Sequence, residues 1–520
     1  MFEAINAILL DIKSKTKEGL NSRLDMQHLK IRKELHPILL ENGKYQLAAA
    51  SYNLNREEKH AICEWLKKLK VPSGFCSNIR SLVSMKDLTF TNYNSHDCHV
   101  MLTTFLPIAT KAINPVFLKM AITRLFYLFN KISEKVIVRD ELESLQKFAS
   151  ETVNQLEMCF PPSFFDIMVH LIVHLVPQIE ALGPMYFHEM WMYERFMSIL
   201  NGYMSNCAHP EGSMIEAYTT EEAIESGGPF CNNLLKDQVS IGLPPLRHEG
   251  RLDGRGRMGW KSFIPPDYNI VLEAHYSILQ QLEIMDPFIE LHMNSIRDDN
   301  PGSTDNWVHK EHKRQFTAWL KELDMTEEES ETIKVLASGP SSQVTSWQSY
   351  DISGFSFSTS DRDTKSMAQN SGVRCEAIDD ATGEITTYFG FIDDIWEVEY
   401  GPRLQIPVFR FRWVQDKHVA MDNYGQRILD LSKVGYKDDP WILANRAAQV
   451  FYVEQILSQN EKKSTQKPKH VVIPGKQQII GVDGVVDLED FNQFRKMSLF
   501  TNFEKNIKIV EESIPQTSLP

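Results

Sequence analysis

The chain has 520 residues, of which 55 are Lys or Arg and 69 are Asp or Glu, so its formal net charge is −14. Hydrophobic residues make up 42% and charged residues 24%, which excludes a wholly disordered chain and a collagen-like one. The negative balance also excludes DNA binding driven by total charge, so any DNA contact must come from a local basic segment.

The length predicts about three domains of ~100–200 residues each. Seven cysteines lie far apart without a C-x-x-C pair, which indicates reduced thiols of the cytosol or nucleus. The N-terminus, MFEAINAILLDIKSK, has no basic region or cleavage site typical of a secretory signal. The most apolar window, residues 164–176, contains Asp166, His170 and His174, so it is too polar to cross a bilayer.

Helical periodicity dominates the first half of the chain. Residues 1–95 are predicted to be helical, with turns at Asn42-Gly43 and after Pro72, and Ile62, Trp65 and Leu69 share one apolar face. Residues 96–226 are the most apolar region and again have helical spacing. We expect several helices there that bury one another in a common core.

The middle of the chain changes character twice. Residues 227–267 are rich in Gly, Arg and Pro at a density that predicts a linker without regular structure. A more polar helical segment is predicted over 268–337. Serine-rich sequence over 338–373 predicts a second linker, although SYDISGFSFSTS alternates as a strand or hairpin would.

Residues 374–455 have a period of two and are rich in aromatic and β-branched residues, as in TTYFGFIDDIWEVEY and IPVFRFRWV. This pattern predicts a compact antiparallel sheet or small barrel. Residues 456–520 are predicted to be a largely disordered tail. The predicted fold class is therefore α+β, with a mostly α-helical N-terminal and central region and a small antiparallel β-rich C-terminal domain.

The first cluster of chemically capable side chains is His96-Asp97-Cys98-His99. On a helix these four side chains spread over all faces, so His96 and His99, three residues apart, are the best pair for a metal ion. The other interpretation is a helix start in which Ser95 or Asp97 caps and the imidazoles form hydrogen bonds.

A second cluster consists of Asp166, His170 and His174, which follow one another at four-residue spacing. This spacing places three possible ligands on one stripe of a helix, but a tetrahedral metal site needs ligands from another element as well. The alternative is that the two histidines are core or interhelical residues with hydrogen-bond partners.

The Gly/Arg segment offers a candidate DNA contact, because the guanidinium fork binds phosphate oxygens in a bidentate manner. Glu249 and Asp253 reduce the net positive charge of this segment. The alternative interpretation is therefore a solvated linker that does not contact DNA. The candidate DNA-binding residues are Arg247, Arg251, Arg255, Arg257 and Lys261.

Long strings of the sequence resemble the C-terminal part of plant CACTA (En/Spm) transposon-encoded transposases. They include NSHDCHVMLTTFLPIA, FPPSFFDIMVHLIVHLVPQIEALGP, MWMYERFMSILNGYMSNCAHPEGSMIEAY and SGVRCEAIDDATGEITTYFGFIDDIWEVEYGP, and together the matches cover most of residues 8–456. The regions 96–218 and 388–455 are similar to two transposase-associated domains of that family.

The resemblance implies an RNase H-like catalytic domain with three carboxylates that hold two Mg²⁺ ions. The first two aspartates of that set would precede this chain. Glu194 in MYERFM is the candidate third carboxylate, and Glu211 in HPEGS is the alternative. The resemblance therefore predicts no cofactor for this chain by itself, and a polypeptide that alone neither cuts nor joins DNA.

Two functions are compatible with these features. The first is a transposon-derived protein in the nucleus, whose domains assist transposition by DNA-end binding or by association with themselves or with a full-length transposase. The second is a host protein–protein or chromatin interaction module, in which Trp396, Tyr400, Trp413 and Tyr436 line a groove; at period-two spacing these rings can equally be core residues. No small-molecule substrate is indicated.

Overall fold

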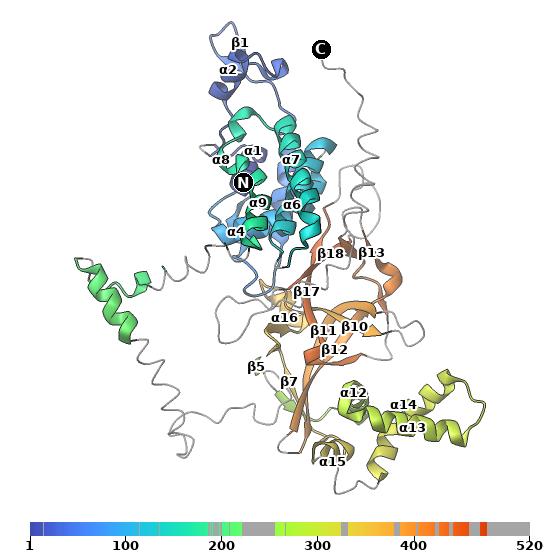
Figure 1. Cartoon of the computed structure of the whole chain (residues 1–520). Helices are drawn as coiled ribbons and strands as arrows, with labels where there is room; N and C mark the ends of the chain where they lie inside the picture. The colour runs from blue at the N-terminus through green and yellow to red at the C-terminus, as the bar shows by residue number, and fades with distance from the viewer. Residues whose placement is uncertain are drawn as a thin grey trace.

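The computed structural model describes residues within the range 1–475, which form a helical domain and a β-rich domain with a helical stretch over residues 210–220 between them in the sequence (Figure 1). The residues within that range that it does not describe are 14, 114, 135, 186–187, 189, 191–196, 198–199, 207, 221–254, 260, 266, 324–330, 379–384, 402–403, 422–425, 436–439 and 457–468.

A helical domain is formed by residues 2–182. Its helices are α1 (Phe2–Leu9), α2 (Leu20–His28), α3 (Arg56–Lys68), α4 (Ser95–Val100), α5 (Leu106–Ala109), α6 (Val116–Ile132), α7 (Leu142–Cys159), α8 (Ile167–His170) and α9 (Ile172–Leu182). Two short hairpins interrupt them, β1 (Ile38–Leu39) with β2 (Tyr45–Gln46) and β3 (Val83–Ser84) with β4 (Thr89–Phe90).

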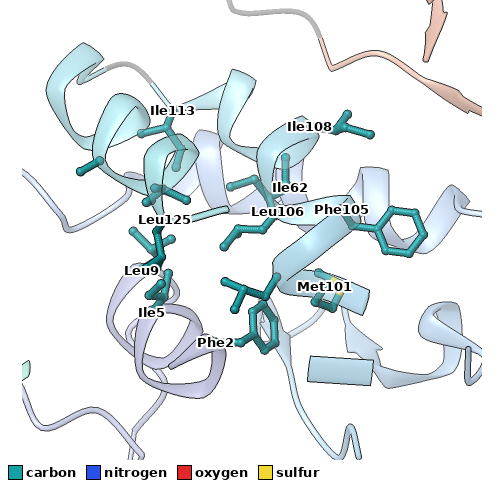
Figure 2. Close-up of a cluster of buried hydrophobic side chains, with 14 of the residues drawn as sticks. Phe2, Ile5, Leu9, Ile62, Met101, Phe105, Leu106, Ile108, Ile113 and Leu125 are labelled. Carbon is teal, nitrogen blue, oxygen red and sulfur yellow. The ribbon is translucent and has the colours of Figure 1, made fainter. Parts of the chain in front are cut away.

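One continuous core holds this domain together. Figure 2 shows Phe2 and Leu9 of α1, Ile62 of α3 and Leu125 of α6 in the same cluster of side chains. The predicted domain boundary at residue 95 therefore does not coincide with a break in packing, because helices from both sides of it bury the same apolar surface.

A β-rich domain follows from residue 255. Its strands are β5 (Arg255–Met258), β6 (Lys261–Phe263), β7 (Val344–Trp347), β8 (Ser349–Ile352), β9 (Phe355–Ser358), β10 (Gly372–Ile378), β11 (Ile385–Tyr400), β12 (Leu404–Val414), β13 (Val419–Met421), β14 (Arg427–Leu429), β15 (Val434–Gly435), β16 (Trp441–Leu443), β17 (Ala448–Glu454) and β18 (His470–Pro474). The main path is β13-β14-β18-β17-β10-β11-β12-β15, with β16 beside β12 and β6-β7 beside β11, and β5-β8-β9 form a separate sheet. The described pairings are antiparallel, and the predicted α+β fold class is confirmed.

Successive side chains of β11 point to opposite faces of the sheet, so this strand contributes to two separate hydrophobic clusters. Trp396, Val398 and Tyr400 pack with α12 (Tyr268–Gln281), whereas Ile395 lies in the cluster that contains Tyr350 of β8. The other helices of the domain are α13 (Asp286–Asp299), α14 (Asp305–Glu322), α15 (Glu331–Ala337) and α16 (Ser360–Lys365).

Three segments differ from the predicted linkers and tail. Residues 255–258 and 261–263 of the first linker form β5 and β6, since backbone pairing with β8 and β7 does not depend on the Gly- and Arg-rich side chains. Residues 344–365 of the serine-rich segment are folded, because Tyr350 and Phe357 are fully buried. In the tail, β18 pairs on both sides, with β17 and β14.

The two domains are joined through β17 and β18. The Phe451 ring of β17 lies 4.8 Å from that of Phe75 and 6.3 Å from that of Phe105, all centroid to centroid. The indole N–H of Trp65 donates to the carbonyl of Glu454 at 2.6 Å. Apolar residues of β17 and β18 thus complete the core of the helical domain.

A buried polar chain links the helices α12, α13 and α14. His292 of α13 and His312 of α14 are almost fully buried, and their Nδ1 atoms lie 2.8 Å apart. His312 Nε2 lies 3.0 Å from the side-chain amide nitrogen of Gln280 on α12. Burial lowers the pKa of His312 to about 4, with smaller contributions from His292 and His309, and burial also lowers the pKa of His292.

These shifts predict a loss of stability in acid. Between pH 6.5, the ordinary histidine pKa, and pH about 4, His312 is neutral when folded but protonated when unfolded, so the free energy of unfolding falls as the pH falls across this window. The loss from His312 is about 3 kcal/mol. Urea denaturation at pH 7.5 and pH 4.5 measures it, and His312→Gln, which does not titrate, should show a smaller difference. An equal difference in both proteins contradicts the prediction.

Candidate interaction surface

An unusual number of large apolar side chains is exposed around the β1–β2 hairpin. Ile38 and Leu39 are 59% and 61% exposed. With their neighbours they form what we call the hairpin surface: Leu29, Ile31, Ile38, Leu39, Leu40, Tyr45 and Leu47. Single exposed apolar residues are common on proteins, but seven of them within residues 29–47 indicate a site of interaction.

The base of the hairpin is fixed by buried polar contacts. Arg23 of α2 forms an ion pair with Glu18, and its Nη1 donates to the carbonyl of Leu35 at 3.1 Å. Lys30 and Arg32 have positive φ angles of 57° and 46°, which are strained for residues with side chains. These contacts direct residues 38–47 away from the core, and Figure 1 shows β1 at the end of the helical domain farthest from the β-rich domain.

The hairpin surface has a basic rim. Residues 28–47 contain four basic side chains, Lys30, Arg32, Lys33 and Lys44, against the two acidic ones Glu34 and Glu41, so the segment has a net charge of +2 in a chain of −14. Lys30, Lys33 and Lys44 are exposed. Protein–protein interfaces usually have an apolar centre and a polar, solvent-accessible rim.

A groove lies beside this surface, where α2 meets the 3-10 turn Pro162–Phe164. Its volume is ≈ 400 Å³, and Ser22 and Ser163 are hydrogen-bonded to each other at 3.0 Å on its wall. The remaining lining residues are Asp25, Met26, His28, Leu29 and Pro162. Leu29 belongs both to the groove and to the hairpin surface, so the two are continuous.

The predicted carboxylate site is not assembled in the described residues. Glu194 lies outside them, and Glu211 is exposed on a helical stretch over residues 210–220. Within the described part of the chain, no group of three or more His, Cys, Asp or Glu side chains could hold a metal ion. The roles predicted for Glu194 and Glu211 stay predictions.

His96 and His99 lie on the short helix α4. Asn94 is the N-cap, and its side chain and that of Asp97 form a capping box, so the predicted helix start is confirmed with Asp97 as part of the cap, whereas Ser95 is not the cap. Asn and Ser are about equally favoured at the N-cap position, so the residue types of Asn94 and Ser95 do not show which of them is the cap. His96 Nε2 lies 3.1 Å from the carbonyl oxygen of Phe75, so this imidazole has a hydrogen-bond partner.

His170 and His174 are brought together, as their spacing suggested. Their Nε2 atoms lie 3.1 Å apart, between α8 and α9, so they form an interhelical contact, but both side chains are exposed, so they are not core residues. Asp166 does not join them, because it caps α8 and pairs with Lys17 at 2.8 Å. The hydrogen bond from Lys17 contributes most to lowering the pKa of Asp166.

The basic residues predicted to contact DNA are divided between strands and undescribed sequence. Arg247 and Arg251 lie outside the described residues. Arg255 and Arg257 belong to β5, and Lys261 is exposed on β6, with its ammonium 5.9 Å from the centre of the Phe263 ring. DNA binding by these residues stays a prediction.

The aromatic groove proposed for an interaction module is not formed by the rings that the structure describes. Trp396, Tyr400 and Trp413 are 5%, 1% and 5% exposed, so all three are core residues. Tyr436 lies outside the described residues. Among the helices described, none is long and apolar enough to cross a membrane.

Sequence reasoning missed the hairpin surface. The signal was present in Ile38-Leu39-Leu40 followed by Asn42-Gly43, since an apolar run before Asn-Gly is a strong hairpin pattern. The helical periodicity around Asn42-Gly43 predicts only a turn between helices there. Exposure of the flanking residues could not be predicted, because it depends on which neighbours the fold provides.

Comparison with known proteins identifies two segments of the chain. Residues 132–240 match a domain of unknown function (DUF4218), and residues 396–464 match another (DUF4216). A search of curated proteins finds no match, and neither does a search of solved structures. The chain thus contains two domains of unknown function that are typical of plant transposase-like proteins.

Proposed function

We propose that this chain is a transposase-like protein of the CACTA (En/Spm) type that has an accessory, non-catalytic role as a component of a nuclear protein–DNA assembly. The two matched domains support the transposase-like character. The long strings shared with CACTA transposases support the finer assignment. In this role the chain needs no cofactor of its own.

The hairpin surface is the observation that carries the proposal. It combines exposed apolar side chains, a basic rim and a groove in one place, and this combination suits a protein partner. Direct association with a catalytically complete transposase of the same transposon type is the simplest way in which such a surface would assist transposition.

Association can be tested by mixing the purified chain with that transposase and measuring binding. The double substitution Ile38→Glu/Leu39→Glu should weaken it at least ~10-fold, which corresponds to ~1.4 kcal/mol, because it places two charges in the apolar centre of the interface. Ile385→Glu is the matched control, since Ile385 is 64% exposed at the start of β11.

Two results would count against an assembly role for the hairpin surface. One is unchanged binding by the Ile38→Glu/Leu39→Glu variant. The other is an equal loss of binding by Ile385→Glu, which would show that any exposed charge suffices. Circular dichroism of each variant separates loss of binding from loss of folding.

A further inference from the structure

The hydrogen-bond pattern of the β1–β2 hairpin determines which backbone groups are available to a partner. The Leu40 amide donates to the carbonyl of Lys44 at 2.9 Å, inside the hairpin. Inward and outward groups alternate along an antiparallel strand. The N–H and C=O of Leu39 therefore point to the outer edge of β1, and those of its partner Tyr45 point to the outer edge of β2.

The outer edge of β1 is open in the part of the chain that the structure describes. Leu39 is 61% exposed, and no described hydrogen bond uses its backbone. A hairpin of two strands is only marginally stable, and an unpaired edge with apolar side chains is a template for another strand. The added strand would also have to cover apolar side chains on both faces of the hairpin.

From this geometry we infer that, when no transposase is bound, the hairpin surface is covered by a second copy of this chain, whose β1 pairs antiparallel with the first about a twofold axis at Leu39. The inference rests on the proposed assembly role. It produces a four-stranded sheet in the order β2-β1-β1-β2, which has enough strands to be stable.

The sequence of the edge is complementary to itself in this register. Leu39 lies opposite Leu39 of the second copy, and Ile38 lies opposite Leu40, so apolar side chains meet apolar side chains on both faces. No charged residue occurs between Pro37 and Leu40. Lys44 is opposite Leu40 within the hairpin, one strand away from the seam, so like charges are kept apart.

The oligomeric state of the full-length chain tests this inference. Sedimentation velocity is measured at protein concentrations between about 1 and 100 µM, the range of dissociation constants that weak dimers have. It should show a species of twice 59.9 kDa. Leu39→Pro removes the outward amide without removing a bond inside the hairpin, so it should give a monomer with unchanged circular dichroism. Tyr45→Pro, the same change at the outer edge of β2, should remain a dimer.

Disulfide trapping provides a second measurement that does not depend on proline being tolerated. Across the seam the two Leu39 Cα atoms would be about 5.5 Å apart, within the range that a disulfide spans. Oxidised Leu39→Cys should form a covalent dimer. Tyr45→Cys is the control, because its two copies would be separated by three strand spacings, about 14 Å.

The outcomes are decisive in each direction. A monomer at all concentrations, a dimer that survives Leu39→Pro, or equal trapping of both cysteine variants overturns pairing through β1. If the chain is monomeric but the Ile38→Glu/Leu39→Glu variant still loses transposase binding, self-pairing fails and the proposed function stands. If that variant binds transposase normally, the proposed function fails independently of the dimer.

Discussion

We expect Arg23→Ala to lower the free energy of unfolding of the helical domain by about 3–5 kcal/mol, because it leaves a carboxylate buried without its partner. The side chains of Arg23 and Glu18 are 2% and 8% exposed. Arg23 also satisfies the carbonyl of Leu35. Glu18 further contributes, after burial, to raising the pKa of the Tyr52 hydroxyl, so this carboxylate influences more than one buried group.

Urea denaturation followed by circular dichroism measures this effect. The double variant Glu18→Gln/Arg23→Met should recover most of the loss, because it removes both charges and keeps the volume of the two side chains. A loss below about 1 kcal/mol for Arg23→Ala would show that water reaches Glu18 in the folded protein.

The Arg23–Glu18 ion pair also fixes the position of the β1–β2 hairpin, which carries the hairpin surface. Arg23 holds the carbonyl of Leu35, and this buried residue lies three positions before the exposed residues 38–40. In Arg23→Ala the hairpin would lose its fixed base, so amide exchange over residues 36–47 should increase more than in α6, which is packed in the centre of the core.

Periodicity was enough to predict the α+β class, because burial imposes it directly. Trp396, Val398 and Tyr400 alternate along β11, and each second side chain is buried against α12. The same rule applied to 349–358, where Tyr350, Ile352, Phe355 and Phe357 are buried, but the many serines between them predicted a linker. Ser356 lies on the partly exposed face of β9, and the buried Ser358 donates a hydrogen bond to Asp363, so these serines fit a folded strand.

Features that depend on long-range partners could not be predicted. β5 forms because β8, almost 100 residues later, satisfies its backbone, with Gly256 opposite Tyr350. The exposed positions of His170 and His174 follow from which side of α8 and α9 lies against the core, and their spacing does not reveal that side. The core of the helical domain also includes Ile473 from β18, in a segment predicted to be disordered.

The two domains depend on each other because single residues belong to both. Phe451 is part of β17, in the β-rich domain, yet its fully buried ring lies among Phe75 and Phe105 of the helical core. Lys70 Nζ also donates to the carbonyl of Asp363 at 2.7 Å, and the amide of Gln369 donates to the carbonyl of Val71 at 3.1 Å. A substitution in one domain at this junction should therefore change the stability of the other domain.

Phe451→Ala should destabilise the helical domain by about 3–5 kcal/mol, since it removes a fully buried aromatic ring and leaves a cavity. Phe389→Ala is the matched control: Phe389 is 1% exposed and packs only with residues of the β-rich domain. In hydrogen exchange, the amides of α3 should exchange at least ~100-fold faster in Phe451→Ala, with a much smaller change in Phe389→Ala. Equal protection of the α3 amides from exchange in both variants would mean that β17 contacts the helical domain without stabilising it.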